Sequence, residues 1–227
     1  MLPESQLPDE GERLAIRGAS PRSSNDEEAR IREAYARRQD GDRYSWFNPG
    51  HVVMVQERER RLLGLLKRYG HESLQEKKIA EIGCGTGYWL REFIKWGARP
   101  ENVLGIDLLP NRVAEARRLL PEAVSIVCGN AAALELDDAT FDLVLQSTVF
   151  TSILNHKMRQ QVASEMMRIM KPDGIIIWYD YHVSNPLNPD AQGVKRREIY
   201  RLFAGYRIKL ERITLAPPIA RRLAPHS

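Results

Sequence analysis

The chain has 227 residues, of which 43% are hydrophobic and 28% are charged, and its net charge is +4. This length and balance indicate a globular protein with one domain and extensions. The N-terminal residues lack the apolar core of a signal peptide, no apolar run is long enough to span a bilayer, and the two cysteines have no metal-ligand spacing. We therefore expect a cytoplasmic protein with no transmembrane segment.

The composition divides the chain into four expected segments. The first is poor in large apolar residues and rich in Pro, Ser, Gly and charge, which predicts a flexible stretch and then a charged helix. The second joins an aromatic cluster to an amphipathic helix, for which Asn48 is a suitable N-cap and Pro49 a suitable first residue. The segments are the N-terminal extension (1–42), the lid and amphipathic helix (43–77), the core (78–215) and a basic C-terminal tail (216–227).

Short apolar runs alternate with helical patterns through the core. Such alternation implies right-handed crossovers and a doubly wound, mostly parallel α/β sheet with helices on both faces. A turn is expected at residues 171–174 and a last strand at residues 206–216. The other expected strands are 78–83, 102–109, 124–129, 141–148 and 174–181, and the helices between and after them are 88–97, 111–120, 157–170 and 194–203.

Three glycines follow the first expected strand of the core. Gly83, Gly85 and Gly87 let the backbone turn sharply and approach a ligand closely, and the start of the next helix favours negative charge. Asp107 lies twenty residues after Gly87, at the end of the second strand, where a carboxylate can accept from the hydroxyls of a ribose. Tyr88 stands where the dinucleotide pattern G-x-G-x-x-G has its third glycine, which disfavours a nicotinamide oxidoreductase. The pattern predicts a nucleoside site of another kind.

Five motifs along the core share one resemblance. They are EIGCGTG, GID, CGNA, FDLVLQST and MKPDGIIIW, within residues 79–181. Together they resemble the class I S-adenosylmethionine-dependent methyltransferases. The resemblance implies a Rossmann-like sheet of seven strands, S-adenosyl-L-methionine as cofactor, S-adenosyl-L-homocysteine as product, and no metal. The residues that it assigns to the cofactor site are Glu81, Gly83, Cys84, Gly85, Gly87, Asp107, Leu108, Asn130, Ala131 and Gln146, although simple packing also explains Cys84.

Two features depart from the family pattern. Asn130 stands where many members have an acid, but its amide oxygen can still accept from an adenine amino group. The family sheet also ends in an antiparallel pair, whereas only residues 206–216 suggest a strand after the fifth one. The last antiparallel strand is therefore expected to be missing, which would leave an unpaired edge beside the fifth strand.

The acceptor side is expected beyond the fifth strand. Asp180, Tyr181 and His182 follow that strand at the carboxyl edge of the sheet. His182 is the natural general base because imidazole titrates near neutral pH, and Asp180 is the second catalytic candidate. A structural histidine and a turn-forming aspartate remain open as alternatives. Tyr181 is expected to contact the substrate.

An aromatic cluster before the core is the expected lid. Aromatic faces of Tyr44, Trp46 and Phe47 suit a position over a sulfonium cation, and plain hydrophobic packing explains them equally well.

The sequence predicts methyl transfer to a small-molecule acceptor, with a hydroxyl of a sugar or natural product as the first choice. Residues 179–189 resemble methyltransferases of bacterial glycan and secondary-metabolite pathways. No amine-methylating N/D-P-P-Y/F motif follows the fourth strand, and nucleic acid is a disfavoured partner because no aromatic residues interleave the basic ones. From Lys195 onward there are nine Lys and Arg residues but only two Glu. An RNA or protein methyltransferase therefore remains an alternative function, as does an inactive nucleoside-binding module.

Overall fold

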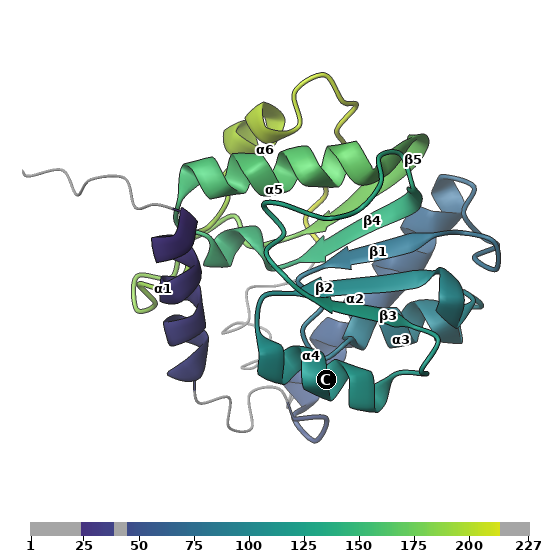
Figure 1. Cartoon of the computed structure of the whole chain (residues 1–227), viewed down its shortest axis with the longest axis horizontal. Coiled ribbons are helices and arrows are strands. Elements are labelled where there is room, and N and C mark those ends of the chain that lie inside the picture. Colours follow the sequence, from purple (N-terminus) through teal and green to yellow (C-terminus); the bar gives the residue numbers. More distant parts are fainter. Residues whose placement is uncertain (1–23, 39–44, 214–227) are drawn as a thin grey trace, which may run out of the picture.

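A five-stranded parallel sheet with helices on both faces forms the centre of the protein (Figure 1). The computed structural model describes residues 24–38 and 45–213. The strands lie in the order β3-β2-β1-β4-β5, and every neighbouring pair is parallel, which confirms the predicted doubly wound α/β fold. They are β1 (Ile79–Ile82), β2 (Val103–Asp107), β3 (Ser125–Cys128), β4 (Phe141–Ser147) and β5 (Met170–Tyr179).

Helices cover the two faces of the sheet as two separate layers. α2, α3 and α4 pack on one face around Ile79 and Leu143, and α1, α5 and α6 pack on the other around Ala80 and Val144. Successive residues of a strand point to opposite faces, so the apolar strand centres supply both cores. The helices are α1 (Ser24–Ala36), α2 (Pro49–Arg68), α3 (Tyr88–Lys95), α4 (Pro110–Leu119), α5 (His156–Ile169) and α6 (Arg196–Leu202).

The start of α2 follows the capping signals in the sequence. The side chain of Asn48 accepts a hydrogen bond from the backbone N–H of His51, and Pro49 is the first helical residue. Gly70 follows the helix end with a φ of 75°, a conformation that glycine adopts without strain. The predicted amphipathic helix is therefore confirmed, together with its N-cap. No helix in the described part of the chain is both long and apolar enough to cross a bilayer.

The expected turn at residues 171–174 is instead a bulge inside β5. Phe141 of β4 pairs with Met170, and Leu143 pairs with Ile175, so the residues between them bulge out. A Cβ at Gly174 would lie 3.0 Å from the backbone oxygens of Phe141 and Asp142, which shows how closely the bulge packs on β4. The strand therefore begins before the Lys-Pro-Asp-Gly stretch rather than after it.

The prediction of a strand at residues 206–216 is wrong over its described part. Residues 207–213 form neither helix nor strand, while residues 214–216 lie outside the described range. Ile208 packs against the core, Leu210 is 37% exposed, and Glu211 accepts from Arg68 of α2 at 2.8 Å, so side-chain contacts rather than strand pairing hold the segment. The described sheet has five strands, with β5 at one edge, and no described strand pairs with the outer side of β5.

Candidate functional site

A cleft opens beside the carboxyl ends of β1, β2 and β4, where the strand order reverses. This is the position at which doubly wound sheets bind ligands. Its walls come from α1, from the starts of α4 and α5, from the loops after these strands and from the loop after β3. The residues that line it are Ile31, Tyr35, Ile82, Gly83, Ile106, Asp107, Leu108, Leu109, Arg112, Gly129, Asn130, Ala131, Ser147, Thr148, Val149, Ser152, Ile153, Met158 and Val162.

The glycine loop after β1 requires glycine at its turning points. Gly83, Gly85 and Gly87 have φ values of 69°, 55° and 77°, which side chains rarely allow. A Cβ at Gly83 would lie 2.4 Å from Cγ2 of Val149, so a larger residue would also clash. The backbone N–H of Gly83 donates to the oxygen of Ile106 at 2.7 Å, which fastens the loop to β2.

Asp107 connects the glycine loop to the start of α4. Its Oδ2 accepts from the backbone N–H of Gly85 at 2.8 Å, and its Oδ1 accepts from that of Leu109 at 2.9 Å. The residue is buried and lines the cleft. The glycine loop and Asp107, which the sequence analysis assigned to one site, are therefore in direct contact.

Glu81 and Cys84 lie beside the loop but not among the residues that line the cleft. Burial, and then the neighbouring Asp107 carboxylate, raise the pKa of Glu81 well above its usual range. Within the described part of the chain its Oε2 has no hydrogen-bond partner. The thiol of Cys84 packs where a Cβ on Gly105 would sit, and burial raises its pKa, so it behaves as a packing residue.

The loop after β3 brings Asn130 and Ala131 to the same side of the cleft as α1, and Leu108, which follows β2, also lines the cleft. The Oδ1 of Asn130 accepts from the backbone N–H of Ala132 at 2.8 Å, and its Nδ2 donates to Oε1 of Glu28 at 2.5 Å. The side chain of Asn130 is thus held from both ends.

Helix α1 closes part of the cleft, which the sequence did not predict. Ile31 and Tyr35 line the cleft, and the Tyr35 hydroxyl lies 3.1 Å from Oγ of Ser152. The guanidinium of Arg112 lies 4.5 Å from the centre of the Tyr35 ring, a cation–π contact. Apolar residues at positions 31, 34 and 35 of a charged helix were the one available signal, since they share a face.

Glu27 anchors α1 to the turn before α5. Its carboxylate accepts from Arg30 and from the backbone N–H groups of Leu154 and Asn155. Burial alone would raise the pKa of Glu27, but these hydrogen bonds outweigh it and lower the pKa. The anchor is therefore ionised when α1 is docked.

Comparisons with known proteins agree with this geometry. A family model described as a methyltransferase domain matches residues 80–178, the span from β1 to the end of β5. Residues 80–178 form a class I S-adenosylmethionine-dependent methyltransferase domain. The family implies S-adenosylmethionine as the methyl donor.

Two relatives of the methyltransferase domain match different shares of this chain. Demethylmenaquinone methyltransferase from Shouchella clausii is 36% identical over 101 residues, which are 43% of this chain and 42% of that protein. 24-methylenesterol C-methyltransferase 2 from Oryza sativa is 27% identical over 161 residues, 64% of this chain and 41% of that protein. The chain therefore matches less than half the length of either relative.

A solved structure shows the same fold as the methyltransferase domain. The PH0226 protein from Pyrococcus horikoshii OT3 superposes with a TM-score of 0.51 and 18% identity, covering 63% of this chain and 79% of that one.

Gln146 and Thr148 shape the turn after β4 of the methyltransferase domain. Gln146 is fully buried; its Oε1 accepts from the backbone N–H of Val149 at 3.1 Å, and its Nε2 donates to the oxygen of Tyr179 at 3.3 Å. Thr148, which lines the cleft, has a φ of 62°, an unusual value for a β-branched residue. Such strain collects at functional sites, and Thr148 is a site residue that the sequence did not reveal.

The expected aromatic lid does not line the cleft in the described structure. Phe47 is 97% exposed and Trp46 is 56% exposed. The Trp46 ring instead lies 6.0 Å from that of Tyr88, beside the start of α3. Tyr44 lies outside the described residues.

None of the three candidates after β5, Asp180, Tyr181 and His182, lines the cleft in the described structure. The carboxylate of Asp180 accepts from the hydroxyl and, at 3.2 Å, from the backbone N–H of Thr151, so it holds the turn at Phe150–Ser152. Burial raises the pKa of Asp180 to about 6. Tyr181 and His182 are exposed, and neither is among the described residues that line the cleft. In the described residues no group of three His, Cys, Asp or Glu side chains forms a metal site.

Proposed function

We propose that this chain transfers the methyl group of S-adenosylmethionine to a small-molecule acceptor. The observation that carries the proposal is the contact between the glycine loop and Asp107 at the edge of the cleft. The absence of a Cβ at Gly83 leaves room beside Val149, and Asp107 presents a buried carboxylate. A carboxylate suits ribose hydroxyls, and a bare backbone suits the close approach of the methionine part.

The other predicted cofactor residues take three roles in this proposal. Leu108, Asn130 and Ala131 bound the base end of the cleft, while Gly85 and Gly87 shape the loop. Glu81, Cys84 and Gln146 support the loops from behind, since they do not line the cleft.

Methyl transfer from a sulfonium is an in-line displacement, so the chain must hold the acceptor and exclude water. The attacking atom has to lie about 3–3.5 Å from the methyl carbon, opposite the sulfur. A hydroxyl acceptor must also lose its proton, for which we propose His182 at the carboxyl end of β5. Asp180 takes the role of a positioning residue, because it fixes Thr151 rather than facing the cleft.

Two observations support a small acceptor. The two relatives described above are named for demethylmenaquinone and a sterol, which are small organic molecules rather than macromolecules. The cleft is also partly covered by α1, which favours an enclosed substrate. The finer proposal is the hydroxyl of a sugar or natural product.

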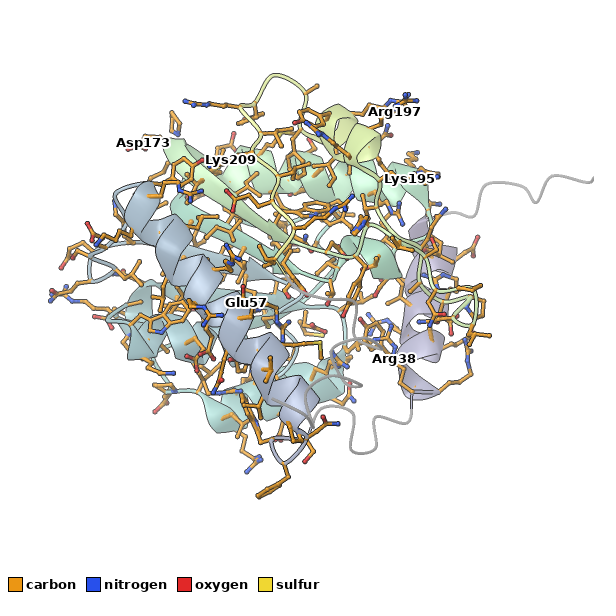
Figure 2. The ribbon with its side chains drawn as sticks, turned by 180° about the vertical axis from the view of Figure 1, so that it is seen from behind. Arg38, Glu57, Asp173, Lys195, Arg197 and Lys209 are labelled. Atoms are coloured by element: carbon orange, nitrogen blue, oxygen red, sulfur yellow. The ribbon has the colours of Figure 1, made fainter. Side chains whose placement is uncertain are left out.

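Basic residues around α6 favour a second candidate, an RNA or protein acceptor. Lys195, Arg196, Arg197 and Arg201 are all exposed, and Figure 2 shows Arg197 projecting outward from α6. Binding to RNA that weakens steeply with salt would favour this candidate over the small molecule.

Calorimetry with S-adenosylhomocysteine tests the cofactor site. Asp107→Ala is expected to weaken binding by about 1.5–3 kcal/mol, the scale of a hydrogen bond to a charged group. The control is Asp173→Ala, on the exposed bulge of β5 (Figure 2). An unchanged affinity in Asp107→Ala removes that residue from the site, and tighter binding of NAD(H) than of S-adenosylhomocysteine overturns the function.

Radiolabelled methyl transfer to a panel of hydroxyl, amine and carbon acceptors tests the reaction. We expect a hydroxyl compound to be labelled, and His182→Ala to slow turnover about 100-fold, within the usual range for a general base, without changing cofactor affinity. His156→Ala is the control, because its side chain is 71% exposed at the start of α5. Cofactor binding without labelling of any acceptor would indicate a nucleoside-binding module.

A further inference from the structure

We propose that Glu28 of α1 is a specificity-determining residue, whose carboxylate accepts a hydrogen bond from the amino group of an adenine in the cleft. The proposal rests on the function proposed above. It starts from one contact, in which Nδ2 of Asn130 donates to Oε1 of Glu28 at 2.5 Å. Asn130 lines the cleft, so this contact brings an acidic side chain from α1 to the wall of the cleft.

Asn130 itself is poorly placed to accept from a base. One of the two acceptor positions on its amide oxygen is taken by the backbone N–H of Ala132 at 2.8 Å, a bond that fixes the turn after β3 and so fixes the direction of the second position. The two N–H groups on its nitrogen are donors, and Glu28 takes one of them. An amino group on a base is itself a donor and needs an acceptor.

Glu28 offers more acceptor positions than Asn130. An ionised carboxylate has two oxygens with about four acceptor positions, and Asn130 uses one of them. The only ion pair that Glu28 makes among the described residues is with Arg32, at 3.9 Å, which is too long for a hydrogen bond. Its side chain is 24% exposed, so most of its surface is shielded but a ligand can still reach it.

The geometry of α1 directs Glu28 to the cleft. Glu28, Ile31 and Tyr35 are spaced three and four residues apart, so they share one face of the helix. Ile31 and Tyr35 line the cleft; Glu28 is not itself a lining residue, but it lies one turn earlier on the same face and contacts the lining residue Asn130. The Glu27 anchor and the contact of Tyr35 with Ser152 hold the helix in this position.

Glu28→Gln gives the sharpest test, because glutamine keeps the shape but changes the chemistry. Its oxygen can still accept from Asn130, so α1 keeps its contact with the loop. Its nitrogen then meets the base as a donor, which opposes an amino group and suits a carbonyl oxygen. The probes are S-adenosylhomocysteine and S-inosylhomocysteine, in which a carbonyl replaces the amino group.

Calorimetry on the full chain is expected to show a change of preference. The wild type should favour S-adenosylhomocysteine by about 10-fold or more, the effect of one hydrogen bond to a charged group. In Glu28→Gln that preference should vanish or reverse. Glu33→Gln is the matched control, because Glu33 lies on the same helix with a side chain that is 73% exposed.

Other outcomes overturn the proposal. An unchanged preference in Glu28→Gln means that Glu28 does not read the base. An equal loss for both compounds means that Glu28 only docks α1. If the wild type binds neither compound, the proposed function itself fails, and this result is distinct because it appears before any substitution.

Discussion

The glycine loop (residues 83–87) and α1 line the same cleft but are held in place by different means. The loop is fixed by its own backbone, through left-handed glycines and hydrogen bonds to the end of β2. Helix α1 is held by side chains, such as Tyr35 on Ser152 and Glu27 on Asn155, across 117 and 128 residues of sequence. One wall of the cleft is thus part of the sheet, and the other is an attachment that can be weakened separately.

The largest expected effect comes from filling the glycine loop. Gly83→Ala places a methyl group 2.4 Å from Cγ2 of Val149 in a residue whose φ is 69°. The cost of the steric clash therefore adds to the cost of the strained backbone. We expect a loss of about 3 kcal/mol in the free energy of unfolding. Chemical denaturation with a fluorescence readout measures this loss.

Gly64→Ala is the control for this substitution. Gly64 lies exposed in α2, and a Cβ there meets nothing within 4 Å. Alanine should stabilise the protein by about 0.5–1 kcal/mol, because glycine is unfavourable inside a helix. A Gly83→Ala variant as stable as the wild type would contradict the backbone account of the loop.

A smaller effect, confined to one wall, is expected from Glu27→Gln. Loss of the carboxylate weakens the hydrogen bonds to Arg30, Leu154 and Asn155, at a cost of about 1–3 kcal/mol for docking of α1. Amide hydrogen exchange should accelerate in α1 while the strands keep their protection. Equal acceleration in α1 and β1 would show that the two walls are not separable.

The smallest net effect on stability is expected at Asp180, where a change in the pH dependence of stability is offset by the loss of hydrogen bonding. The pKa of Asp180 is about 6 in the folded protein against an ordinary value of 3.8, so the folded state binds the proton more tightly. The contribution of protonated Asp180 to the free energy of unfolding is fully present below pH 3.8 and is lost as the pH rises through about 6.

Asp180→Asn removes this titration. Relative to the wild type, the variant should gain up to about 3 kcal/mol between pH 4 and pH 7, the size of a difference of about two pKa units, and this gain is set against the weakened hydrogen bonds to Thr151. Unfolding curves at several pH values measure the difference, with the exposed Asp173→Asn as the control. Parallel stability profiles for wild type and Asp180→Asn would contradict it.

The sequence predicted what the backbone encodes locally. Alternating apolar runs gave the parallel sheet, and the spacing of Gly87 and Asp107 matched a contact that the structure contains between Gly85 and Asp107. These features depend on short stretches whose geometry allows few residue types. The start of α2 was predictable for the same reason, since Asn48 and Pro49 act on the adjacent turn.

Contacts between distant side chains were not predictable. The pattern around Asp180 suggested a catalytic residue, but no local signal reveals that Thr151 lies within reach of its carboxylate. Likewise, the charged face of α1 gave no sign that Glu27 meets the backbone before α5. Trp46 and Phe47 were predicted to form a lid from their residue types, because the sequence does not show where their side chains lie in space.

The bulge at the start of β5 also bears on how the protein avoids aggregation. Among the residues that the structure describes, β5 is an edge strand of the sheet, and exposed edges invite pairing with other chains. Its first half carries Lys171, Asp173 and Pro172, which has no N–H to donate, and the bulge interrupts the regular backbone. An added strand would find a straight template only along residues 175–179, so half of this edge is protected against self-assembly.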